Sequence, residues 1–220
     1  MTLHRNIISK LLLVLCIGLI FNLSPCHAQW DTAGLRLHHF KVGPAATSAA
    51  LMATGTLFTY NPTANNFAVN LRDKVVSGNN PHLHFDDYVQ FIPVSAPLVL
   101  NLCGVKGKHT FGQLLMLEGG SYLLGGGWLN AFKYWLAVER PDGSRLNSFP
   151  SGHTFTAFTG AEILRREYGE DYPWIAVAGY AVAVTVAAMR IYNNRHWLGD
   201  VCAGAGLGIL SVTLTYWALD

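Results

Sequence analysis

The chain contains few charged residues and few cysteines. Only 13% of its 220 residues are Asp, Glu, Lys or Arg, and the formal net charge is +2. The sequence has no basic run and no series of basic and aromatic residues, so we expect no nucleic-acid partner. Its four cysteines are scattered along the chain, which argues against a disulfide framework.

Apolar residues and glycine are abundant instead. Hydrophobic residues make up 51% of the chain, and 22 residues are glycine. This composition is too apolar for a typical soluble enzyme. It is typical of a small membrane protein whose helices touch through small residues. A chain of this length forms one domain by default.

The N-terminus reads as a targeting segment. Arg5 and Lys10 precede an apolar run at residues 11–23, and Ala28 offers a small residue at the expected cleavage point. We therefore predict a secretory signal peptide over residues 1–28, with an uncleaved anchor as the alternative. Residues 29–220 would then form a single domain.

Five apolar segments follow, at residues 88–105, 111–138, 154–164, 173–189 and 201–219. They predict an all-α transmembrane helical bundle with five or six spanning helices. Residues 45–60 are also apolar but short for a span. They could lie at the membrane interface or pack against the bundle. If the signal is cleaved, residue 29 lies outside the membrane. Counting the later apolar segments as spans from that side favours a segment 45–60 that does not cross.

Three short blocks carry the groups suited to chemistry. They read Lys-x6-Arg-Pro at residues 133–141, Pro-Ser-Gly-His at residues 150–153 and Arg-x5-His-x3-Asp at residues 190–200. Lys133 and Arg140 are two helical turns apart and would share one helix face. Three cations, two imidazoles and a Ser-Gly turn suit a tetrahedral oxyanion, above all phosphate.

The spacing within the last two blocks suggests roles for individual residues. The turn at residues 150–152 opens a helix at His153, and unpaired N–H groups at a helix start attract anions. Asp200 lies one turn after His196, close enough to accept a hydrogen bond from one ring nitrogen. The other nitrogen would then be left as a nucleophile.

These blocks resemble the signature of the type 2 phosphatidic acid phosphatase (PAP2) superfamily. That group includes membrane lipid phosphatases, soluble bacterial acid phosphatases and vanadium haloperoxidases. Every signature position matches except Met189, where the family usually has Ser. The resemblance implies a helical bundle of the PAP2 and haloperoxidase type. The residues around the second and third blocks also resemble lipid phosphatases of the lipid A type.

The resemblance also implies a mechanism. His196 would attack phosphorus and become a phosphohistidine, Asp200 would orient it, and His153 would protonate the leaving oxygen and then activate water. The oxyanion would be held by the remaining signature residues: Lys133, Arg140, Ser151, Gly152 and Arg190. No metal or other cofactor is expected, because these cations take that role.

We therefore expect a bacterial membrane lipid phosphatase that hydrolyses a phosphomonoester or pyrophosphate of a lipid, of the lipid A or polyprenyl pyrophosphate type. A periplasmic non-specific acid phosphatase of the same superfamily is the first alternative. A non-catalytic lipid-binding or transport protein is the second. The expected partners are the phosphorylated lipid and the membrane, with no obligatory protein partner.

Loop charges predict the orientation. Four basic residues fall on the side of the bundle opposite the three blocks: Lys106, Lys108, Arg165 and Arg166. Cytoplasmic loops are enriched in Lys and Arg, so this side is expected to be cytoplasmic. The active site would then face the periplasm from the inner membrane.

The sequence contains two further polar features. Glu118 lies within an apolar segment, where an ionisable group is a functional candidate. His82, His84, Asp86 and Asp87 could be drawn as a metal site, but their spacing fixes no ligand geometry. We interpret this stretch as a polar loop at the rim of the bundle.

Overall fold

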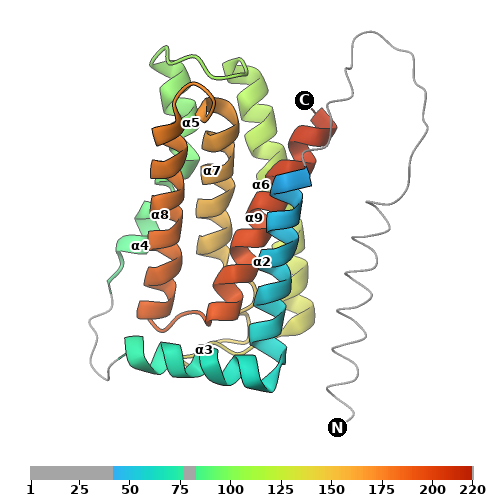
Figure 1. Cartoon of the computed structure of the whole chain (residues 1–220), viewed down its shortest axis with the longest axis vertical. Helices are drawn as coiled ribbons and strands as arrows, with labels where there is room; N and C mark the ends of the chain where they lie inside the picture. The colour runs from blue at the N-terminus through green and yellow to red at the C-terminus, as the bar shows by residue number, and fades with distance from the viewer. Residues whose placement is uncertain (1–41, 77–82, 220) are drawn as a thin grey trace, which may run out of the picture. The chain divides into compact units, whose positions relative to one another are not determined.

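The computed structural model describes residues 42–76 and 83–219, which fall in one compact unit and contain helices and no strands (Figure 1). The predicted signal segment lies outside the described residues. The helices are α2 (Val42–Tyr60), α3 (Pro62–Val75), α4 (Phe85–Val89), α5 (Ile92–Leu102), α6 (Phe111–Leu136), α7 (Gly152–Tyr168), α8 (Pro173–Tyr192) and α9 (Leu198–Leu219). The all-α prediction is confirmed.

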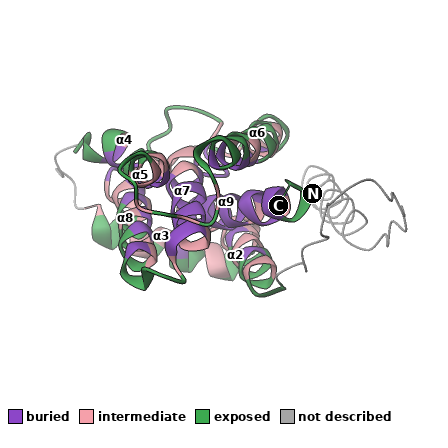
Figure 2. Cartoon of the chain, turned by 90° about the horizontal axis from the view of Figure 1, so that it is seen from above, coloured by how far each residue is buried: buried purple, intermediate pink, exposed green. Residues whose placement is uncertain are grey.

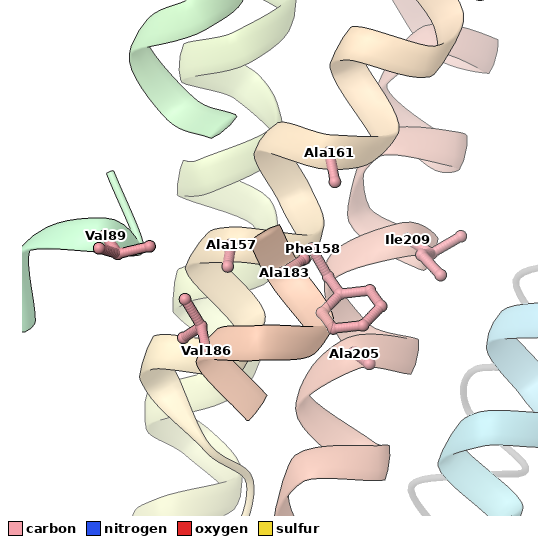
Figure 3. Close-up of a cluster of buried hydrophobic side chains, with 8 residues drawn as sticks. All are labelled: Val89, Ala157, Phe158, Ala161, Ala183, Val186, Ala205 and Ile209. Atoms are coloured by element: carbon pink, nitrogen blue, oxygen red, sulfur yellow. The ribbon is translucent and has the colours of Figure 1, made fainter. Parts of the chain in front are cut away.

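Helix α7 lies at the centre of the bundle. It contacts α5, α6, α8 and α9, and Figure 2 shows buried residues concentrated along α7 and α9. One core cluster joins Ala157, Phe158 and Ala161 of α7 to Ala183 of α8 and Ala205 of α9 (Figure 3). These small side chains let the helices approach closely, as the glycine and alanine content predicted.

Local signals explain the helix boundaries that frame the site. The backbone N–H of Thr110 donates to Gln113 Oε1 (3.1 Å) at the start of α6. That helix ends at Ala137, whose left-handed conformation (φ 44°) closes it before the loop to α7. Pro173 begins α8, a position where the missing N–H costs no hydrogen bond.

Helix α2 decides between the two placements expected for residues 45–60. It packs antiparallel along α9: a Cβ on Gly206 would lie 2.8 Å from Ser48 O, and a Cβ on Gly199 would lie 2.7 Å from Gly55 O. Its 19 residues extend for about 28 Å. Of the two placements expected for residues 45–60, the structure shows the one against the bundle. Among the described residues, α8 and α9 are the helices long and apolar enough to span a membrane, and α2 is not one of them.

The apolar segments match the helices unevenly. By length and composition, α8 and α9 are each apolar enough to span a membrane, and α6 covers most of the predicted 111–138 segment. The predicted 88–105 segment is instead divided, because α4 ends at Val89 and α5 begins at Ile92. Large apolar side chains, including Leu123 and Trp174, are exposed on outer faces. Such surfaces suit a lipid environment.

Glu118 lies away from the catalytic blocks. Its side chain is buried in α6, where Oε2 has no hydrogen-bond partner among the described residues. It precedes Lys133 by fifteen residues, or about 22 Å along the helix. We therefore assign it no part in the site described below.

The approach of α5 to α7 makes a stability prediction. A Cβ on Gly160 would lie 2.5 Å from the carbonyl carbon of Pro93. The neighbouring atoms belong to the backbone of α5 and cannot move aside as a flexible side chain would. Gly160→Ala should destabilise the bundle by about 1–3 kcal/mol. Gly126→Ala is the matched control: no neighbour lies within 4 Å of its Cβ, so it should be neutral or stabilising. Thermal unfolding in detergent compares them, and equal unfolding temperatures would contradict the packing.

Candidate active site

The three signature blocks meet at one end of the bundle, as predicted. The ends of α6 and α8 and the starts of α7 and α9 all point to this end, and α3 runs across it (Figure 1). Arg72 of α3 ties the loops together, donating to Pro141 O (3.0 Å) and to Asn194 Oδ1 (2.8 Å). The fold thus brings residues more than sixty positions apart into one site.

His196 and Asp200 form the predicted pair. His196 Nδ1 lies 3.3 Å from Asp200 Oδ2, which also accepts from the Trp197 N–H (2.8 Å) and from the Ser148 hydroxyl. Ser148 Oγ lies 3.4 Å from the same ring nitrogen. These contacts gather around Nδ1, so Nε2 is the nitrogen left for attack. Ser148 was not predicted, because it stands outside the signature.

Burial sets the charge of His196. The residue is only 1% exposed. Burial lowers its pKa to about 4; Asp200 opposes this shift, and the positive charges of Lys133 and Arg190 add to it. His196 is therefore neutral at physiological pH, and a neutral imidazole carries the lone pair that a nucleophile needs.

Two of the predicted cations are held by one residue. Lys133 Nζ donates to Asn147 O (2.6 Å), and Arg140 Nε donates to Asn147 Oδ1 (2.9 Å). Within the described residues, the two terminal nitrogens of Arg140 make no hydrogen bond. Arg140 can therefore present a pair of donors to a phosphate.

The Ser-Gly turn departs from the expectation in one respect. The Ser151 N–H donates to Asp200 O (3.0 Å), and Ser151 Oγ accepts from the Thr154 hydroxyl (3.0 Å). The Ser151 N–H is therefore engaged in joining α7 to α9. Gly152 begins α7, where first-turn N–H groups have no partner within the helix.

Two carboxylates lie in the candidate site, although the sequence analysis placed both in a polar loop at the rim of the bundle. Arg190 donates to Asp86, and its Nη1 lies 3.5 Å from Asp87 Oδ1. His153 Nε2 lies 2.8 Å from the same Asp87 oxygen. Asp86 is buried and also accepts from Asn193 Nδ2 (2.9 Å). The rim-loop interpretation is therefore wrong for Asp86 and Asp87.

Asp87 lies between the imidazole of His153, whose pKa burial lowers, and the guanidinium of Arg190. Burial alone would raise the pKa of Asp87, but hydrogen bonds with His153 and His84 and the charges of His153 and Arg190 outweigh burial and lower it. Ligand atoms of Asp86, Asp87 and His153 lie within 4.8 Å of one another, a spacing that could hold a metal ion. The Arg190 guanidinium already neutralises these carboxylates and opposes an added cation.

A cavity of about 360 Å³ opens beside these groups. Four arginines line it, together with Asp86 and Asp87: Arg140, Arg145, Arg190 and Arg195. Two of the four belong to the signature and two do not. His153 and His196 do not line the cavity, so an anion that entered it would meet the arginines first.

Comparisons with known proteins agree with this arrangement. Residues 115–220 match the PAP2 superfamily. The lipid A 1-phosphatase of Porphyromonas gingivalis is 37% identical over 96% of this chain, and this chain spans half the length of that relative. A lipid A 1-phosphatase of Helicobacter pylori is 38% identical over 34% of this chain and 38% of its own length.

Two solved structures share the fold. The transmembrane PAP2 type phosphatidylglycerolphosphate phosphatase of Bacillus subtilis has a TM-score of 0.60 at 20% identity, covering 80% of this chain and 95% of its own. LpxE of Aquifex aeolicus has a TM-score of 0.50 at 23% identity, covering 67% of this chain and 93% of its own. These two structures share the helical fold of this chain, and the segment that matches the PAP2 superfamily, residues 115–220, contains all three signature blocks.

Proposed function

We propose that this protein hydrolyses the phosphate of a membrane lipid through a phosphohistidine at His196. The observation that carries the proposal is the buried, neutral His196, held at Nδ1 by Asp200 on the edge of a cluster of cations. Phosphate is the anion that such a cluster suits best, and no protein metal is required for the step.

The chemistry follows in two displacements. His196 Nε2 attacks phosphorus while the bond from phosphorus to the leaving oxygen breaks, and His153 gives that oxygen a proton. His153 then takes a proton from water, the water oxygen attacks phosphorus, and the bond to His196 breaks. Lys133, Arg140 and Arg190 balance the charge on the phosphoryl oxygens throughout.

A lipid is the favoured substrate class. The relative from P. gingivalis is named a lipid A 1-phosphatase and aligns with nearly all of this chain. Exposed apolar side chains on α6 and α8 favour a membrane enzyme over a soluble periplasmic acid phosphatase. The substrates we propose are therefore lipid phosphomonoesters or pyrophosphates of the lipid A or polyprenyl type.

We place the site on the periplasmic face of the inner membrane. Lys106, Lys108, Arg165 and Arg166 lie at the opposite end of the bundle, where α5 and α7 end, and this end is cytoplasmic by the charge rule. Helix α2 also begins there, at Val42. We propose that the chain enters α2 from this cytoplasmic side, which differs from the prediction that residues 45–60 do not cross.

The nucleophile assignment gives the first prediction. His196→Ala should abolish turnover of a lipid phosphate, because no other group can form the covalent intermediate. Asp171→Ala, a change to an exposed residue at the opposite end, should leave the rate unchanged. Phosphate release from purified protein in detergent measures both. A His196→Ala protein with the wild-type rate would overturn the mechanism.

Asp87 gives a second prediction, in which phosphate binding becomes tighter while turnover becomes slower. Its carboxylate contacts both His153 and Arg190 and so repels an incoming phosphate. Asp87→Ala should tighten inhibition by inorganic phosphate, and kcat should fall roughly tenfold because His153 loses the acceptor that orients its ring. Kinetics with phosphate as inhibitor measure both quantities. Unchanged kcat together with unchanged inhibition would show that Asp87 has no role.

The orientation gives a third prediction. In a cysteine-free background, a cysteine at Asn66 of α3 should react with an impermeant maleimide in cells whose outer membrane is permeable. A cysteine at Lys106 should react only after lysis. Both positions are exposed in the structure, so protection would reflect the membrane and not the fold. The reverse pattern would place the active site in the cytoplasm.

A further inference from the structure

The cavity contains more positive charge than the phosphatase signature explains. Arg140 and Arg190 are signature residues, whereas Arg145 and Arg195 are not. Arg190 is balanced by Asp86 and Asp87, and Arg195 Nη1 pairs with Asp142 Oδ2 (2.9 Å). Among the described residues, Arg140 and Arg145 have no carboxylate within ion-pair distance.

The loop after α6 holds Arg140 and Arg145 next to each other. The Arg140 N–H donates to Arg145 O (3.0 Å), and the Gly143 N–H donates to Arg140 O (3.0 Å). Gly143 has φ 69°, the left-handed conformation that this tight turn requires. The Ser144 N–H donates to Asp142 Oδ1 (3.0 Å), which closes the turn further. The turn therefore holds the backbone of Arg145, whose exposed side chain lines the cavity.

The two guanidinium groups repel each other in the absence of an anion. The pKa of Arg140 is lowered, chiefly by burial and then by the charge of Arg190, with smaller contributions from Arg195 and Arg145; Asp142 opposes the shift. A bound anion would relieve this repulsion. One phosphate at His196 needs only the signature cations, and the cavity of about 360 Å³ that Arg140 and Arg190 line is also lined by Arg145.

Resting on the function proposed above, we propose that Arg145, together with Arg140, binds a second phosphate of the substrate next to the one that is hydrolysed. The preferred substrate is then a lipid diphosphate. Its terminal phosphorus lies at His196 and its inner phosphate at Arg145. The bond from the terminal phosphorus to the bridging oxygen breaks, water supplies the new oxygen, and the products are a lipid monophosphate and inorganic phosphate.

The kinetic test uses two substrates that differ only in the second phosphate. Farnesyl diphosphate and farnesyl monophosphate are hydrolysed by the full chain in detergent. Arg145→Gln should raise KM for the diphosphate about tenfold or more, the size expected for one charge-assisted hydrogen bond. KM for the monophosphate should stay within about twofold. Arg145→Lys should restore part of the loss, since it keeps the charge.

Lys74→Gln is the matched control for charge. Lys74 is exposed on α3 at the same end of the bundle but does not line the cavity. It should change KM for the two substrates equally or not at all. An equal change of both KM values in Arg145→Gln, or no change, would overturn the proposal.

A binding experiment separates this proposal from the proposed activity. Methylenediphosphonate and inorganic phosphate are titrated into the protein in the presence of EDTA. This binding measurement needs no turnover. Arg145→Gln should weaken the diphosphonate about tenfold or more and phosphate by less than about twofold. Equal affinities in wild type and variant would contradict the second phosphate site. Inactivity of the wild type with this binding pattern intact would contradict only the proposed hydrolysis.

Discussion

The contact between the starts of α7 and α9 fixes the geometry of the candidate active site. The Ser151 N–H donates to Asp200 O (3.0 Å), and a Cβ on Gly204 would lie only 2.6 Å from Ser151 O. This close approach sets the turn that carries His153 against the turn that carries Asp200. Because the Ser151 N–H takes part in this contact, the second signature block contributes to architecture as well as to anion binding.

Charges of both signs gather around that contact. Three signature cations at one helix-bundle end repel each other, and the protein offsets one of them with Asp86 and Asp87. The Asp87 oxygen contacts His153 and Arg190 in the way that a phosphate oxygen would. A substrate phosphate can therefore replace one carboxylate contact with a better one.

The sequence predicted the parts of this site that lie close together along the chain. Asp200 one turn after His196, and the turn before His153, are local patterns whose geometry follows from the helix. The contacts of Arg190 with Asp86 span 104 positions, and no local pattern encodes them. The sequence left the placement of α2 open between the membrane interface and the bundle for a related reason. Its Ala, Gly and Thr residues look weakly apolar in sequence, but they fit the glycines of α9 at close range.

The central claim is that His196 carries the phosphoryl group. Protein mixed with a lipid phosphate and quenched within milliseconds in alkaline detergent, where phosphohistidine survives, can be digested and read by mass spectrometry. The account predicts a phosphate on the peptide containing His196 in the wild type, with more of it in a His153→Ala protein, whose intermediate is hydrolysed slowly. Turnover with no phosphate on that peptide in either protein would contradict it.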